Sequence, residues 1–379
     1  MPISAKAEIV RPSKENSRLP VVSVIIPCYN YGRYLAQCLD SVLHQEDVRV
    51  DVIVIDDASP DGSGQIVRKL GAQDTRIRTV CHATNQGHIA TYNEGISLVT
   101  GDYTLLLSAD DLLTPGCLAR AVSLMEKYPS VGLAYGSPVE FADGDLPAAR
   151  TIAKSWIIWQ GSDWIAQMCK TGENVIKCPE AILRTGVLRE IGGYHAHLPH
   201  AADFELWMRA ATVSDVGYLV GADQAYYRNH ANNMHHSAFS VLDDYSQRLA
   251  SFDTIFDERS ELLKESASMR DTAHRAIARL SLSQATRDAA YRALARNALS
   301  HPIGTYLHGS VGDESAADYA EFALKAWPDA TQFREWRVLD KILHTHDSTP
   351  SLNLSLIMRM VMRKCRTRFL LWRRKWAGV

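Results

Sequence analysis

The sequence predicts an α/β protein whose doubly wound, mostly parallel sheet is followed by a helical C-terminal region. Between residues 21 and 136, short β-branched and apolar runs alternate with segments of helical periodicity. These runs are apolar at nearly every position, as strands covered by helices on both faces require. From about residue 239 such runs stop, and Ala, Leu, Arg and Glu dominate, which favours helices packed on one another.

The elements follow in the order that a βαβ series needs. Five runs are predicted strands: residues 21–27, 50–57, 77–82, 102–108 and 131–136. Four segments between them are predicted helices: residues 32–45, 62–71, 87–101 and 115–128. Leu35, Leu39 and Val42 form one apolar stripe in the first of these helices, and Gly101 is a candidate C-cap for the third. Because parallel strands need crossover helices, the series predicts a doubly wound sheet.

We expect four parts in the chain. They are a polar N-terminal leader (1–20), the α/β domain (21–237), a helical region (238–350) and a basic amphipathic tail (351–379). The helical region is expected either to fold alone or to lean on the sheet domain.

The formal net charge of -2 conceals an uneven distribution. The last 28 residues carry eight Lys and Arg and no acid, so the rest holds 33 bases against 43 acids. Cations mixed with Trp, Phe and Leu suit an anionic membrane surface; packing of the tail on the acidic body is the alternative. No nucleic-acid partner is expected, since the acidic body shows no basic face. Scattered cysteines and the lack of an apolar leader or span predict a cytoplasmic protein, with the inner face of the cell membrane as a peripheral site.

Polar segments follow three of the predicted strands. They are PCYN (27–30), DDASPDGS (56–63) and SADD (108–111). Ligands of open parallel sheets bind at the carboxyl ends of the strands, where these segments should converge. Several carboxylates in one crevice repel each other, and Mg²⁺ or Mn²⁺ bound with a nucleoside diphosphate would neutralise them. No Walker motif or GxGxxG follows the first strand. The alternative is that each Asp merely caps the following helix.

An ordered set of motifs carries a resemblance to a known family. VSVIIPCYNYGRYLAQCLDSVLHQ, DVIVIDDASPDGS, NQGHIATYNEGI and GDYTLLLSADDLL resemble the inverting family 2 glycosyltransferases with the GT-A fold. The likeness extends through AILRTGVLREIGGY, HAADFELWMRAA and YYRNHANNMHHS, and so covers roughly residues 21–237. It implies a nucleotide-sugar donor, a metal-binding DxD-type motif and an Asp that acts as general base.

The resemblance assigns donor-binding residues by matching motif positions. Those matching the nucleoside-binding and donor-side segments are Pro27, Tyr29, Asn30, Asp56, Asp57, Asn85 and Gly87. A carboxylate suits the N3 proton of uracil or thymine, so a UDP-sugar is the favoured donor.

The metal and base positions come from three further motifs. In SADD the first DxD position is Ser108, which departs from the family, while Asp110 is the position expected to touch Mn²⁺ or Mg²⁺. Both are expected to bind the donor, Ser108 through a hydrogen bond from ribose or a metal-bound water. His230 matches the YR-x-H element and is expected to complete the metal shell. Asp203 matches the base position of ED-x-x-LW-x-R, with Ala202 in place of Glu. The expected reaction is an inverting displacement by a hydroxyl of a glycan or lipid-linked glycan, as in surface polysaccharide assembly.

Two other functions stay open at this point. Ser108 and Ala202 favour a pseudo-enzyme that binds a sugar nucleotide or glycan without transfer. A nucleotidyltransferase would use a similar acidic crevice but normally has a Gly-rich basic loop after its first strand, which PCYNYGRY is not. The histidines of residues 194–200 are expected in an acceptor-side loop, and at least two of Trp156, Trp159 and Trp164 in the core.

Overall fold

The computed structural model describes residues 2–7, 18–230, 233, 239–256, 283–307 and 315–344. Within these residues ten strands form one sheet, in the order β1-β8-β10-β7-β9-β5-β2-β3-β4, with β6 paired to β10. The strands are β1 (Ile3–Lys6), β2 (Val21–Cys28), β3 (Arg49–Asp56), β4 (Ile77–Cys81), β5 (Tyr103–Leu106), β6 (Leu112–Leu113), β7 (Val131–Phe141), β8 (Ser155–Trp159), β9 (Ala181–Arg184) and β10 (Asp215–Arg228).

The predicted fold class is confirmed, and all five predicted strands are present. β2, β3, β4 and β5 pair in parallel, as do β7 and β10. The sequence analysis did not identify β9, which lies antiparallel between β5 and β7, nor the antiparallel β8. Residues 3–6, placed in the polar leader, form the edge strand β1 and pair with β8. An edge strand needs no apolar faces, so hydrophobic alternation could not predict it.

The four predicted helices are also present. They are α1 (Gly32–Leu43), α2 (Ser63–Gln73), α3 (His88–Ser97) and α4 (Cys117–Lys127). Gly101 does not cap α3, which ends at Ser97 with Leu98 as its C-cap. Gly101 instead lies against β2, where an added Cβ would come within 2.7 Å of the carbonyl oxygen of Val21. Its lack of a side chain thus serves a close approach of two backbones.

Two apolar layers cover the sheet, because successive strand residues point to opposite faces. In β2, Val24 packs with α1 and α4, whereas Ile25 packs with α3 and a large second cluster. Behind that second face lie α5 (Gly161–Thr171), the 3-10 turn η1 (Cys178–Glu180), α6 (Thr185–Ile191) and α7 (Ala202–Val213). All three tryptophans Trp156, Trp159 and Trp164 are buried, which confirms the core interpretation.

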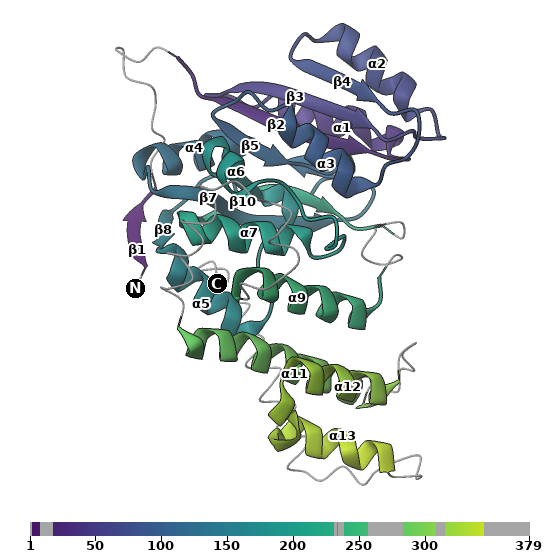
Figure 1. The fold of residues 1–379 in the computed structure, drawn as a ribbon. Coiled ribbons are helices and arrows are strands. Elements are labelled where there is room, and N and C mark those ends of the chain that lie inside the picture. Colours follow the sequence, from purple (N-terminus) through teal and green to yellow (C-terminus); the bar gives the residue numbers. More distant parts are fainter. Residues whose placement is uncertain are drawn as a thin grey trace.

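The C-terminal helices lean on the sheet domain and do not form a separate core. They are α9 (Val241–Phe256), α11 (Gln284–Leu307), α12 (Ala316–Ala326), the 3-10 turn η3 (Pro328–Gln332) and α13 (Arg334–His344). Figure 1 shows them stacked in succession below α7 and α5. Phe252 of α9 and Leu294 of α11 belong to the same apolar cluster as Trp207 of α7. Among the described residues, this region therefore packs on the sheet domain.

No helix of the described residues is long and apolar enough to cross a membrane. The basic tail, residues 351–379, lies outside the described residues.

The start of α5 offers a test of this packing. A Cβ at Gly161 would clash with the carbonyl oxygens of Ala211 and Ser214 at the end of α7. Because both are backbone atoms, we expect Gly161→Ala to lower the free energy of unfolding by about 1–3 kcal/mol in urea titrations. Gly186→Ala in α6 is the matched control, since nothing lies within 4 Å of the added carbon and helix propensity favours Ala. Equal stability of the two variants would contradict the packing.

Candidate active site

Two loops at the carboxyl end of the sheet, after β2 and β3, are joined to each other. The hydroxyl of Ser59 accepts a hydrogen bond from the amide of Asn30 at 3.1 Å. Asn30 and Ala58 both adopt left-handed backbone conformations, with φ of 60° and 57°. Tyr29 beside them is 45% exposed, so its ring is open to a ligand, while Pro27 lies half-buried in β2. Unusual backbone conformations held by neighbouring loops are a common feature of functional sites.

Asp56, the last residue of β3, has a buried carboxylate whose two oxygens are not both hydrogen-bonded by the described residues. Its Oδ2 lies 3.4 Å from the amide of Ser59. Its Oδ1 is buried and has no hydrogen-bond partner among the described residues. A buried acceptor without a donor is costly, so this oxygen suits an N–H of a ligand.

Asp57 uses its carboxylate within the protein. It accepts hydrogen bonds from the amides of Gln86 at 2.8 Å and Gly87 at 2.9 Å, and contacts His82 Nδ1 at 2.7 Å. Burial opposes its ionisation, but these bonds prevail and lower the pKa of Asp57. Asn85 accepts from the same Gly87 amide at 3.0 Å. Asp57, Asn85 and Gly87 therefore shape the turn that begins α3.

Removing this carboxylate should weaken the fold measurably. We expect Asp57→Ala to lower the free energy of unfolding at pH 7 by about 2–3 kcal/mol, because two amides lose a charged acceptor. Since the folded-state pKa is lowered, the contribution is present above the unfolded pKa and is lost as the pH falls through the folded value. Asp74→Ala, which removes a more exposed pair with Arg76, should cost less than about 1 kcal/mol. Urea unfolding of both variants checks this, and similar losses would refute it.

Asp110 and His230, far apart in sequence, lie together beside the β5 exit. His230 Nε2 is 3.0 Å from Asp110 Oδ2, and both side chains are over nine-tenths buried. The Tyr34 ring stacks on the imidazole with centroids 5.4 Å apart, and Tyr31 meets it edge-on at 5.7 Å. Burial raises the pKa of Asp110, so its ionised form lacks full compensation from the protein.

Asp111 has a different environment from its neighbour. Its Oδ1 accepts a hydrogen bond from the amide of Arg228 at 2.8 Å, while the Arg228 Nε donates to the carbonyl of Asp110 at 2.8 Å. Burial, with the charge on Asp110, raises the pKa of Asp111 well above its usual value. Asp111 thus ties the SADD segment to β10, which leaves Asp110 as the carboxylate beside His230.

The pair fits a divalent cation in its chemistry. A carboxylate oxygen and an imidazole nitrogen within 3.0 Å are a donor set that Mn²⁺ accepts, and Mg²⁺ less readily. In the described part of the chain, no cluster of three His, Cys, Asp or Glu side chains is placed to hold a metal. A cation here would therefore need diphosphate oxygens and water to complete its shell, as such sites commonly do.

Asp203 lies in the first turn of α7 with a partly exposed side chain. Its Oδ2 accepts a hydrogen bond from Asn174 Nδ2 at 3.2 Å, and its Oδ1 lies 2.6 Å from the amide of Phe204. Burial among protein atoms raises the pKa of Asp203 to about 6, against the lowering effect of these bonds. A carboxylate of that pKa can take a proton near neutral pH.

Cys178 joins the two halves of the site. Its thiol contacts the carbonyl of Leu106 at 3.5 Å and the hydroxyl of Tyr194 at 3.7 Å. Burial raises the pKa of this thiol, and the charges on Asp203 and Asp111 act in the same direction. Tyr92 extends the connection, since its hydroxyl lies 3.4 Å from Ser108 Oγ. The base candidate and the SADD segment therefore border one buried polar region.

The sequence analysis missed several residues of this region. Asn174 and Cys178 lie in a segment without a recognised motif, and Tyr34 was assigned only to a helix. Arg228 stands in YYRNH, in the element that the resemblance matched for His230, and that position was the one available signal. Of the loop histidines, His200 contacts Asp244 at 3.1 Å.

Comparison with protein families matches residues 23–192 to "Glycosyl transferase family 2". An "uncharacterized glycosyltransferase" of Haemophilus influenzae is 28% identical over 219 residues, which is 56% of this chain and 67% of that protein. A Nostoc sp. protein of the same description is 28% identical over 235 residues, 59% of this chain and 69% of the relative.

The fold is also found among solved structures. The crystal structure of S. aureus TarS residues 1–349 in complex with UDP-GlcNAc has a TM-score of 0.52. It is 17% identical in sequence, and the match covers 83% of this chain and 93% of that one. At this identity the likeness concerns the fold.

Proposed function

Residues 23–192 match glycosyl transferase family 2, and on that premise we propose that the chain moves a sugar from a nucleoside-diphosphate sugar to a hydroxyl of a glycan or lipid-linked glycan, with inversion at the anomeric carbon. The observation that carries the proposal is the buried Asp110–His230 pair beside the exit of β5.

The donor is proposed to lie across the loops after β2, β3 and β5. Asp56 would accept the N3 proton of uracil through its unused Oδ1, which is consistent with a UDP-sugar donor. Tyr29 would offer its exposed ring to the base, and Pro27 and Asn30 would shape the floor beneath it. Asp57, Asn85 and Gly87 would bound the sugar side of the donor through the turn that begins α3.

The chemistry follows from the positions of two acids. Asp203 accepts the proton of the acceptor hydroxyl while the oxygen of that hydroxyl attacks the anomeric carbon of the donor sugar. The bond from that carbon to the diphosphate breaks in the same step, so no covalent link to the enzyme forms and the configuration inverts. Asp110 and His230 would hold Mn²⁺ or Mg²⁺, which when bound supplies Lewis-acid stabilisation of the leaving diphosphate. Ser108 would accept or donate a hydrogen bond beside them.

A donor panel tests this proposal. The protein is incubated with UDP-, GDP- and dTDP-sugars and Mn²⁺, Mg²⁺ or a chelator, and released nucleoside diphosphate is measured. UDP-GlcNAc belongs in the panel because TarS was crystallised with it. Release from at least one UDP-sugar with a divalent cation is expected. Turnover of no donor under any metal condition would overturn the proposal.

The pH dependence of turnover gives a second test. A general base works in its ionised form, and the pKa of Asp203 is raised from 3.8 to about 6. We therefore expect kcat to fall tenfold per pH unit below about 6 and to level off above it, until other groups titrate. An acidic limb near pH 4 would show that a carboxyl of ordinary pKa is the base.

The acceptor is proposed to be a glycan at the membrane surface, in polysaccharide assembly, with the basic tail (351–379) as a peripheral anchor. Co-sedimentation with vesicles containing anionic lipid, with and without residues 352–379, tests the anchor. Binding by the full chain and its loss on truncation are expected, whereas equal binding would contradict the role of the tail.

A further inference from the structure

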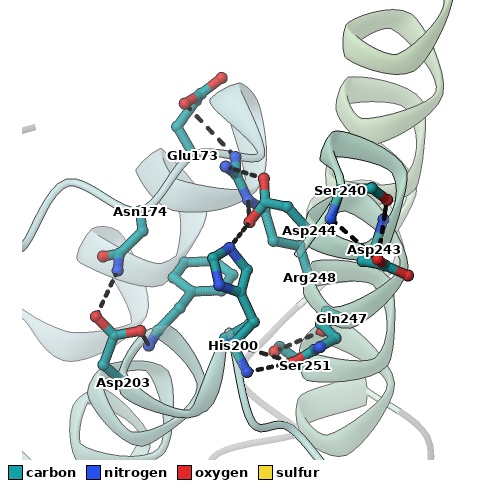
Figure 2. A network of polar contacts seen from close by, with 12 residues as sticks. Glu173, Asn174, His200, Asp203, Ser240, Asp243, Asp244, Gln247, Arg248 and Ser251 are labelled. Atoms are coloured by element: carbon teal, nitrogen blue, oxygen red, sulfur yellow. Dashed lines mark hydrogen bonds and ion pairs between the residues drawn. The ribbon is translucent and has the colours of Figure 1, made fainter. Parts of the chain in front are cut away.

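One face of α9 is turned toward the segments that flank Asp203. Asp244, Gln247, Arg248 and Ser251 recur at spacings of three and four residues, so they lie on one side of the helix. Figure 2 shows three of them, Asp244, Gln247 and Arg248, reaching toward His200 and toward the turn that carries Asn174. The helix belongs to the C-terminal region, beyond the part of the chain that matches the family.

Gln247 forms hydrogen bonds with the residues at the start of α7. Its Oε1 accepts hydrogen bonds from the amides of His200 at 2.7 Å and Ala201 at 3.1 Å. Ala201 is the N-cap residue of α7 and makes no side-chain cap of its own. The first amides of a helix lack partners within the helix, so an acceptor from a neighbouring element fixes how it begins. Asp203 lies two residues beyond this contact.

Arg248 holds the segment on the other side. Its guanidinium donates to the carbonyl of Gly172 at 3.0 Å and lies 3.5 Å from the carboxylate of Glu173. Gly172 ends α5 in a left-handed conformation, with φ of 66°. The turn leads directly to Asn174, which donates to Asp203 Oδ2. Arg248 therefore fixes the turn that presents the hydrogen-bond donor of the base.

Asp244 connects these two contacts. Its carboxylate pairs with Arg248 one helical turn later and lies 3.1 Å from His200 Nε2. His200 also packs against the ring of Phe239, at a centroid distance of 4.7 Å. As Figure 2 shows, the contacts run from Glu173 through Arg248 and Asp244 to His200. Both flanks of Asp203 are thus attached to one rigid helix.

We propose that Asp244, Gln247 and Arg248, which we call the α9 clamp, are positioning residues that hold the Asp203 carboxylate in place for proton transfer. The inference rests on the proposed function and extends it, because it makes the C-terminal helices a part of the active site. None of the three contacts Asp203 directly among the described interactions; they act through Asn174 and the start of α7.

The clamp also contributes charge. The ionisable groups around Asp203 are His200 from the preceding loop, Arg248 from α9, Cys178 from η1 and Tyr194 from the loop after α6. The positive charge of Arg248, and the electrostatic interaction with His200, favour the carboxylate against the dominant effect of burial. Removing the positive charge of Arg248 acts in the direction of a higher pKa for Asp203.

Arg248→Met is the first test. We expect kcat to fall about 10- to 100-fold, as a slight displacement of a catalytic group allows, with the donor KM within about threefold of wild type. The acidic limb of the pH profile should move upward by about half a unit or more. The matched control is Arg292→Met, which removes an Arg that also pairs four residues along its helix, with Asp288 on α11. In the control, kcat and the pH of the acidic limb should both match those of wild type.

Two further variants separate position from charge. Arg248→Lys keeps the charge, so the acidic limb should return toward the wild-type pH while kcat stays reduced. Gln247→Ala is neutral, so kcat should fall while the limb stays near the wild-type pH. In hydrogen exchange, the amides of His200 and Ala201 should exchange faster in Gln247→Ala than in wild type. If Arg248→Met fails to fold, hydrogen exchange of Gln247→Ala is the deciding measurement. Exchange of the His200 and Ala201 amides at the wild-type rate would overturn the proposed α9 clamp.

A titration without substrate keeps the clamp separate from the reaction. Protein labelled with ¹³C at aspartate carboxyls is titrated by NMR, with Asp203→Asn to assign the resonance. The Asp203 pKa should be higher in Arg248→Met than in wild type and Arg292→Met. If wild type turns over no donor, the proposed function fails. The titration is then the remaining test of whether the α9 clamp affects the Asp203 carboxylate. An Asp203 pKa and kcat equal to those of the control would overturn it.

Discussion

Asp203→Asn is expected to lower kcat about 10³-fold with little change in donor KM, because the acceptor hydroxyl loses its proton acceptor. Asn keeps the size of the side chain and can still accept a hydrogen bond from Asn174, so the site keeps its shape. The residual rate should lose the acidic limb near pH 6, since the group that titrates there is gone.

Stability distinguishes loss of the base from loss of the fold. The raised pKa of Asp203 means that its ionised form is disfavoured in the folded protein. The folded state is therefore penalised as the pH rises from the unfolded pKa through about 6, and the penalty is complete above it. Asp203→Asn removes this charge and should leave Tm unchanged or raised at pH 7.

The matched control is Asp163→Asn, because Asp163 also lies in the first turn of a helix, α5. If the role of Asp203 were only to favour a helix N-terminus, the two variants would behave alike. A kcat of Asp203→Asn within threefold of wild type would exclude the base assignment.

Asp110→Asn is expected to lower kcat/KM on the order of 10²–10³-fold, the scale for loss of one preorganised electrostatic group. The change removes the negative charge beside His230 without removing the hydrogen-bonding shape. We expect the Mn²⁺ concentration for half-maximal activity to rise and the advantage of Mn²⁺ over chelator to shrink. His230→Ala should show the same pattern more weakly, since imidazole brings no negative charge.

Asp51→Asn serves as the control for Asp110→Asn. Asp51 pairs with Arg78 near the amino end of β3, whereas the site lies at the carboxyl end. Its Mn²⁺ dependence should match wild type. Full wild-type activity in the presence of chelator would contradict the role of Asp110 in holding a cation.

The parallel half of the fold could be predicted because its strands are buried on both faces. Continuous apolar runs such as residues 21–27 and 50–57 are typical of parallel strands that helices cover on both faces. β8 and β9 escaped prediction because antiparallel pairing across long sequence separations leaves no local pattern, as in Leu133 of β7 opposite Leu183 of β9. β10 also pairs with distant segments, in parallel with β7 and antiparallel with β8. Their positions follow from tertiary packing, which a periodicity argument does not contain.

The candidate site was also predictable from the sequence only in part. Asp110 and His230 could be expected to meet because two motifs of a resembling family contain them, and the structure places them 3.0 Å apart. Nothing local linked Asn174 or Arg248 to Asp203, because each reaches it through a turn or helix from another part of the chain. The hydrogen bonds of Asp57 to the amides of Gln86 and Gly87 were likewise not visible in its motif, and its donor-binding role stays a prediction.

The anomeric configuration of the product distinguishes a single displacement from two. With an α-linked UDP-sugar and water or a short alcohol as acceptor, ¹H NMR identifies the anomer formed first, before it mutarotates. A single displacement driven by Asp203 predicts the β-anomer, and its formation should slow about 10³-fold in Asp203→Asn. A product that keeps the α configuration would require two displacements or another nucleophile, and would contradict the assignment of Asp203 as the general base.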